Sequence, residues 1–72
     1  MTFDLRRLET GGLVYRYETE GAALAFVRDV VRIRGHEQAA CFALEEQDTE
    51  GNARAIAKGA DLVRRAVQDR AP

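Results

Sequence analysis

The densest group of possible metal ligands in this sequence is the segment EEQDTEGN at residues 45–52, which holds four carboxylates and one glycine. Calcium loops of the helix-loop-helix kind place oxygen ligands at positions 1, 3 and 5, glycine at position 6 and a bidentate glutamate at position 12. Counting from Glu46 meets the earlier requirements, but the twelfth residue is Ala57. Because this ligand is missing, we expect a solvated hairpin turn and no specific metal site, with weak ion binding left open.

His36 and Cys41 are the only histidine and the only cysteine of the chain, too few for a zinc site. Cys41 lies in the apolar run AACFAL, where a thiol is most simply a small buried hydrophobic side chain. His36 follows Gly35 at the expected end of a helix, where it would interact with the helix dipole. The chain has no serine nucleophile and no phosphate-binding glycine fingerprint. We therefore predict that the protein is not an enzyme, has no catalytic residues and holds neither a metal nor a cofactor.

The charged residues are nearly balanced, with 11 basic and 12 acidic side chains and a net charge of -1. Such a chain creates no overall field that would attract nucleic acid or anionic lipid. A local basic patch could still form, and its candidates are four arginines on the expected helices: Arg28, Arg32, Arg64 and Arg65. Acidic neighbours accompany them, which is typical of a solvated helix face. A small nucleic-acid-binding regulator is therefore the alternative function.

The elements that position these residues begin with a β-hairpin over residues 2–18. The alternation around Tyr15 and Tyr17 predicts a half-buried strand, and the segment TGG at residues 10–12 supplies a tight turn. The two tyrosines should lie on one sheet face with Leu13. There they either pack beneath a helix or line an association surface, where tyrosines are enriched.

A long amphipathic helix should follow the hairpin. Thr19 is a good N-cap, and Gly35 is a natural stop after Arg34. Between them, apolar residues recur at helical spacing along one broad stripe.

Residues 37–58 allow two interpretations, because their short apolar runs suit either buried strands or helices. Gly59 would destabilise a continuous helix by about 1 kcal/mol, and a lone hairpin needs further strands to form a stable sheet. We therefore predict a second hairpin, with strands near 38–46 and 53–57, and a final helix near 60–70.

The predicted fold is thus α+β, with a small antiparallel sheet of two hairpins, one long helix and a short C-terminal helix in the order ββαββα. It comprises a single domain of residues 1–72. The alternative is a chain that is mostly helical after residue 19.

The apolar stripe of the long helix is wider than one sheet face usually covers, so a second layer must lie against its flank. Either the last helix or a second copy of the chain supplies that layer, and 72 residues build only a small core. We therefore predict a non-catalytic protein-interaction module that forms a homodimer. The predicted contact residues lie on the two helices: Leu24, Val27, Val31, Leu62 and Val63.

The sequence also predicts a cytoplasmic protein with no membrane partner. No apolar run approaches the roughly 18 residues that span a bilayer, and the segment MTFDLRRLE lacks the apolar region of a signal peptide. A single cysteine that cannot form an internal disulfide suits a reducing compartment.

Two long segments carry a resemblance to known proteins. The segments YETEGAALAFVRDVVRIRG and FALEEQDTEGNARAIAKGADLVRRA are similar to a group of small uncharacterised bacterial proteins that combine a hairpin, a helix, an acidic-turn hairpin and a final short helix. This resemblance implies an α+β fold and no particular activity. The shorter segment ETEGAALAFVRDVV also resembles small antitoxin-like domains with a partial double-stranded-RNA-binding-like fold.

Overall fold

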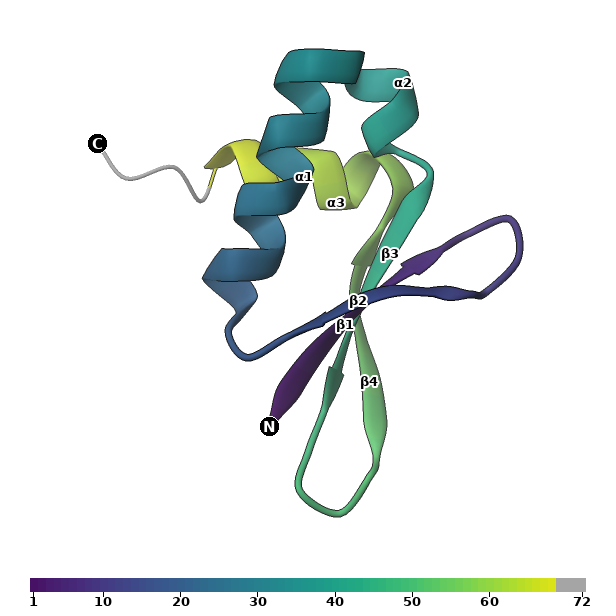
Figure 1. The fold of residues 1–72 in the computed structure, drawn as a ribbon, viewed down its shortest axis with the longest axis vertical. Helices are drawn as coiled ribbons and strands as arrows, with labels where there is room; N and C mark the ends of the chain where they lie inside the picture. Colours follow the sequence, from purple (N-terminus) through teal and green to yellow (C-terminus); the bar gives the residue numbers. More distant parts are fainter. Residues whose placement is uncertain (69–72) are drawn as a thin grey trace.

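The computed structural model describes residues 1–68, which form four strands and three helices (Figure 1). In chain order these are β1 (Thr2–Arg7), β2 (Leu13–Tyr17), α1 (Glu20–Arg34), α2 (His36–Ala39), β3 (Phe42–Gln47), β4 (Ala53–Lys58) and α3 (Gly59–Gln68). The strands make one antiparallel sheet in the order β2-β1-β3-β4. The predicted α+β fold is therefore confirmed, with α2 as an additional helical turn, and the mostly helical alternative is wrong.

The two hairpins lie side by side because β1 and β3 are the central strands of the sheet. Leu5 of β1 lies opposite Leu44 of β3, and both side chains are completely buried. Side chains alternate between the two faces of a strand, so these leucines mark the face that the helices cover. In Figure 1 the three helices gather at one end of the molecule, and the β3–β4 turn projects from the other end.

The boundaries of α1 follow from its two caps. The hydroxyl of Thr19 accepts a hydrogen bond of 3.1 Å from the backbone N–H of Ala22, which satisfies one of the free donors of the first turn. At the other end Gly35 adopts a φ of 93°, and its N–H donates to carbonyls of the last turn. Residues with a side chain rarely adopt this φ, which is why a glycine ends the helix. The predicted limits of this helix, Thr19 and Gly35, are confirmed.

Strand β3 begins later than predicted, because residues 36–39 form the short helix α2. This shift changes the environment of Cys41, which is exposed and not a buried hydrophobic residue as we predicted. Ala39 at the end of α2 and Phe42 at the start of β3 are the buried residues before and after Cys41. The Cys41 thiol lies 3.6 Å from the carbonyl oxygen of Glu37, to which it donates.

Gly59 forms the junction between β4 and α3 with a φ of 59°. This conformation is readily available to glycine, which agrees with its predicted place at a strand-to-helix junction. The predicted helix near 60–70 is confirmed as far as Gln68, and residues 69 and 70 lie outside the described part of the chain.

The predicted dimer surface is wrong at most of its positions, because the flank of α1 is covered by α3 of the same chain. Leu24, Val27 and Leu62 are at most 1% exposed, and Val63 is 6% exposed. The guanidinium of Arg28 donates a 3.0 Å hydrogen bond to the carbonyl of Ala66, which links the two helices. These side chains are therefore enclosed within one copy of the chain. Of the two arrangements that the sequence allowed, the last helix, and not a second copy, supplies the second layer. Only Val31 remains partly exposed.

Residues 48–52 of the acidic segment form the β3–β4 hairpin turn, as predicted, and residues 45–47 are the end of β3. The carboxylate of Asp48 accepts hydrogen bonds of 2.9 Å from the backbone N–H groups of Glu50 and Asn52. These bonds hold the pKa of Asp48 below its ordinary value, and the bond from the backbone N–H of Asn52 has the largest effect. Gly51 supplies the positive φ of the turn. The carboxylate is therefore used to shape the loop.

None of the helices within residues 1–68 is long and apolar enough to cross a membrane.

Candidate functional site

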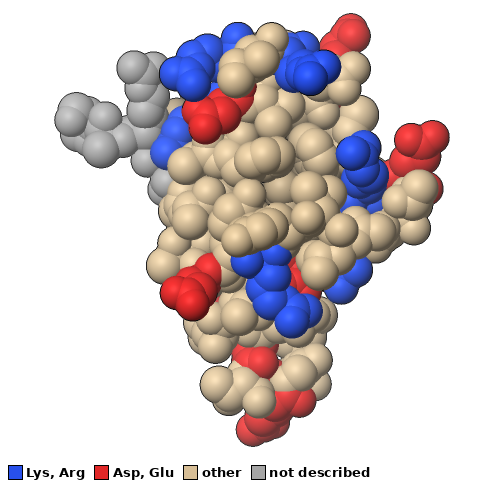
Figure 2. Space-filling view, viewed as in Figure 1, with Lys and Arg blue, Asp and Glu red and all other residues tan. Residues whose placement is uncertain are grey.

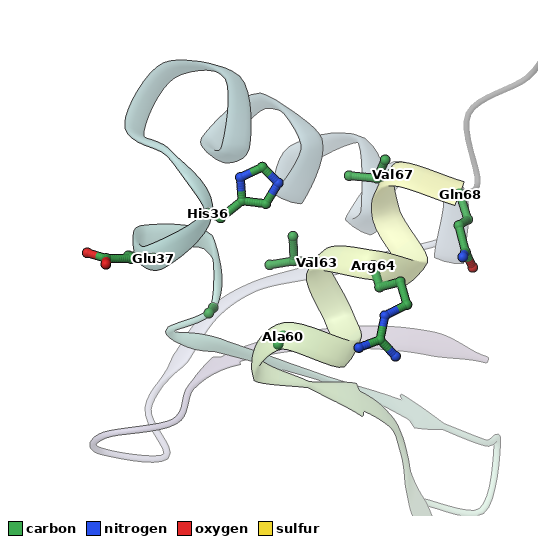
Figure 3. A pocket seen from close by; sticks show the side chains of 8 residues that line it. His36, Glu37, Ala60, Val63, Arg64, Val67 and Gln68 are labelled. Atoms are coloured by element: carbon green, nitrogen blue, oxygen red, sulfur yellow. The ribbon is translucent and has the colours of Figure 1, made fainter.

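An open groove with a volume of about 550 Å³ lies between α2 and α3 (Figure 3). We call it the α2–α3 groove. Its lining comes from α2, from the residue that follows it and from one face of α3: His36, Glu37, Ala40, Ala60, Val63, Arg64, Val67 and Gln68. Its floor is therefore mainly aliphatic, and its polar residues lie at the rim.

The side chains around the groove differ in direction, as Figure 3 shows. Val63 and Val67 point from α3 into the space between the helices, and the imidazole of His36 lies above them. Glu37 points away from this space, so its carboxylate does not face the aliphatic floor. Val67 is 45% exposed although it belongs to the apolar stripe of α3. This exposure indicates a surface with room for an additional apolar group.

A second hollow, of about 500 Å³, adjoins the groove on the side of α1. His36 and Val67 line both hollows and therefore stand at their boundary. The remaining lining residues all come from α1: Arg28, Asp29, Val31 and Arg32. This hollow contains Val31, the one predicted contact residue that stays partly exposed.

The α2–α3 groove was not predicted from the sequence. The one-turn helix α2 was not predicted, and it supplies the second wall. A signal was present in the broad apolar face of the last helix, where Val63 and Val67 lie four residues apart.

The four arginines predicted for nucleic-acid binding do not form a free basic patch. Arg32 pairs with Asp29 at 3.1 Å, and Arg64 pairs with Asp61 at 3.1 Å. Arg65 lies 2.7 Å from Glu20 at the start of α1. Arg28 is bonded to the carbonyl of Ala66.

The charges are nevertheless unevenly placed along the molecule. On the face in Figure 2, blue side chains gather at the helical end, where red ones also occur, and red side chains cover the tip of the opposite end. Because acidic partners stand beside Arg32, Arg64 and Arg65, these arginines do not form the continuous basic surface that a phosphate backbone contacts.

A cluster of polar side chains covers the sheet face opposite the helices. Its centre is Asp4, which is completely buried. Arg16 donates two hydrogen bonds to this carboxylate, of 2.7 and 3.1 Å. Gln47 donates a third, of 2.9 Å, and Arg6 lies 3.6 Å away. We call Asp4 and these three partners the Asp4 cluster.

The Asp4 cluster favours the ionised carboxylate. The hydrogen bond from Arg16 holds the pKa of Asp4 below its ordinary value, and the charges of Arg16 and Arg6 act in the same direction. Burial opposes this shift but does not overcome it. The cluster joins three neighbouring strands, because its members come from β1, β2 and β3. Its satisfied hydrogen bonds indicate a structural role for this face.

The outer strand β2 presents large apolar side chains to solvent. Leu13 is 49% and Tyr15 is 59% exposed. The ring of Tyr15 lies 4.8 Å from that of Tyr17 between centroids, and Tyr17 contacts Phe26 of α1. Burial, with a smaller effect of Tyr15, raises the pKa of Tyr17.

Tyr17 thus packs against the helix as predicted, whereas Tyr15 stays largely exposed. Leu13 is not in register with the two tyrosines, because the pairing of β1 and β2 shifts between Leu5 and Arg6. Leu13 lies opposite Arg6, and Val14 is the extra residue of a β-bulge.

Comparison with known proteins finds no relative of the chain. No family model matches the chain, and searches of curated proteins and of solved structures find no significant match.

Proposed function

We propose that the chain is a non-catalytic interaction module that forms a homodimer through the outer edge of β2. The observation that carries this proposal is the exposure of Tyr15, at 59%, on an outermost strand of the sheet. This surface replaces the helix flank that the sequence predicted, where the apolar side chains are buried within one copy.

The position of β2 makes it suitable for strand pairing. It is hydrogen-bonded to β1 on one side and is the last strand of the described sheet on the other. An edge strand presents unpaired N–H and C=O groups, and exposed apolar side chains on such a strand favour association. The opposite edge strand, β4, carries the exposed cation Lys58 and also Arg54, which is exposed but paired with Glu46. Charged residues of this kind discourage edge-to-edge pairing, so the β2 edge is the better surface.

A second copy of the chain is the partner with matching chemistry. Antiparallel pairing of β2 with itself about a two-fold axis near Tyr15 would place this tyrosine against its counterpart. Such an interface is self-complementary, and cross-strand aromatic pairs stabilise sheets. In this register Arg16 would lie opposite Val14 and not opposite another arginine. Asp4 already neutralises Arg16, so the pairing brings no like charges together.

We further propose that the dimer acts in the cytoplasm. Cys41 is an exposed free thiol, and a reducing compartment keeps such a group from forming disulfides.

Sedimentation velocity from low micromolar to millimolar concentrations tests the dimer. The wild-type protein should change from monomer to dimer over this range. The substitution Tyr15→Lys should keep the protein monomeric, because an exposed lysine on an edge strand opposes pairing. The matched control is Ile33→Lys, on α1, where the side chain is 71% exposed. This control should dimerise like the wild type.

A monomeric wild type at millimolar concentration would refute the proposal. So would a dimer that survives Tyr15→Lys with unchanged affinity. Circular dichroism melts of each variant establish that the comparison involves folded proteins.

A further inference from the structure

The α2–α3 groove has the size and lining of a small-molecule site. Its volume of about 550 Å³ falls within the roughly 300–1,000 Å³ typical of ligand pockets, which combine an apolar lining with a few polar groups. Here the floor is formed by aliphatic side chains such as Val63 and Val67, and the imidazole of His36 lies above them. We propose that this groove binds a small amphipathic acid, with an aliphatic body and one carboxylate.

The length of the groove wall favours such a ligand over a helix of a partner protein. Helix α2 has four residues, which corresponds to about 6 Å at 1.5 Å per residue. An amphipathic helix that binds through residues i to i+7 needs about 10 Å of matching groove. An aliphatic chain is narrower and can lie along the side of α3 that Ala60, Val63 and Val67 form.

The two hollows hold both signs of charge: Glu37 and Arg64 line the groove, and Asp29 and Arg32 line the adjoining hollow. The two arginines could reach the carboxylate of a bound acid. Their ion pairs with Asp61 and Asp29 join residues three apart, and all four side chains are at least 60% exposed. Exposed pairs of this kind contribute little to stability, so either arginine can turn toward an added carboxylate.

The boundary between the two hollows sets the orientation of the ligand. His36 and Val67 line both of them. The aliphatic body would lie on the floor of the α2–α3 groove, and the carboxylate would lie near His36, on the side of Arg32. The imidazole can donate a hydrogen bond to a carboxylate oxygen there.

Titration of the ¹⁵N-labelled protein with decanoate, below its micelle concentration, tests the site by NMR. Decanoate should cause saturable shifts at His36, Ala60, Val63 and Val67. Octanoate, which is two CH₂ groups shorter, should bind about fifteenfold more weakly, because each buried CH₂ contributes about 0.8 kcal/mol, or roughly a factor of four. Decyltrimethylammonium, with the same chain and a positive head group, should bind at least several-fold more weakly than decanoate.

Two variants and one control complete the experiment. Val67→Asp places a carboxylate on the floor and should abolish binding, and Arg32→Gln should weaken decanoate several-fold. The matched control is Ile33→Asp, an exposed apolar position on α1 that lines neither hollow. It should bind decanoate like the wild type.

Three results would overturn the proposal. The first is the absence of saturable shifts with decanoate, and the second is equal affinity for the cationic and anionic ligands. The third is a set of groove shifts that appears on raising the protein concentration alone, because a second copy would then cover the groove. The homodimer proposed above predicts concentration-dependent shifts at residues 13–18 instead, so the two proposals fail independently.

Discussion

Arg16 of β2 binds the buried carboxylate of Asp4 on β1 through two hydrogen bonds, of 2.7 Å from Nε and 3.1 Å from Nη2. The carboxylate is completely buried although it points away from the helices. Its neighbours cover it, because Gln47 donates a hydrogen bond to it and Arg6 lies beside it. The sheet is thus organised on both faces, by aliphatic packing on one and by the Asp4 cluster on the other.

Removing this carboxylate should destabilise the protein. We expect Asp4→Ala to lower the free energy of unfolding by about 1–3 kcal/mol, the usual range for lost hydrogen bonds to a charged group. Urea denaturation followed by circular dichroism measures the change. The control is Glu45→Ala, which removes a partly exposed partner of Arg6 and should cost less than about 1 kcal/mol. Equal costs for the two variants would contradict a central role of Asp4.

Stability should also depend on pH through Asp4. Its pKa is lower in the folded protein than the ordinary value of 3.8, so the unfolded chain binds the proton more readily. The stabilisation is therefore fully present above the ordinary value and is lost as pH falls through the folded pKa. Urea midpoints between pH 7 and pH 2 should show this loss in the wild type. Asp4→Asn should have a smaller pH dependence, and an unchanged profile would contradict the prediction.

Because the flank of α1 is buried, substitutions on its two sides should differ in their effect on stability. Leu24 is 1% exposed, so Leu24→Ala should lower the free energy of unfolding by about 2–5 kcal/mol through lost packing and a cavity. Ile33 is 71% exposed on the same helix, and Ile33→Ala should stay within about 0.5 kcal/mol of the wild type. Thermal and urea unfolding measure both. A Leu24→Ala protein of normal stability with weaker dimerisation would instead restore the helix flank as an interface.

The strand-to-helix junction at Gly59 should resist substitution. Its φ of 59° is left-handed, and an added Cβ would meet only ordinary contacts, the nearest at 3.7 Å. Gly59→Ala should therefore cost about 1–2 kcal/mol of unfolding free energy, from the backbone alone. The control is Gly21→Ala in α1, where a Cβ has open space. That substitution should stabilise the protein by up to about 1 kcal/mol, and equal effects in both variants would exclude the backbone explanation.

Local signals in the sequence were sufficient to predict most of the elements. Thr19 and Gly35 carry the cap chemistry of α1, and Gly59 marked the junction before α3, so these boundaries could be derived from neighbouring residues alone. The acidic turn could be predicted for the same reason, because Asp48 bonds within its own loop.

Properties that depend on contacts between distant residues could not be predicted in this way. Composition suggested a buried thiol for Cys41, but one helical turn before β3 placed this side chain outside. The apolar stripe of α1 showed that a second layer was needed, and it could not show whether that layer came from α3 or from another copy. Asp4 gave no signal at all, because its partners Arg16 and Gln47 are far from it in the sequence and adjacent only in the sheet.

The central position of β1 has a consequence for synthesis on the ribosome. This strand is made before both of its neighbours, and one of them, β3, includes residues 42–47. The nascent chain must therefore hold the first hairpin without its second partner until residues 42–47 have been translated. Pairing across such a separation is slow compared with helix formation. The sheet should thus acquire its cooperative structure only after β3 has left the exit tunnel.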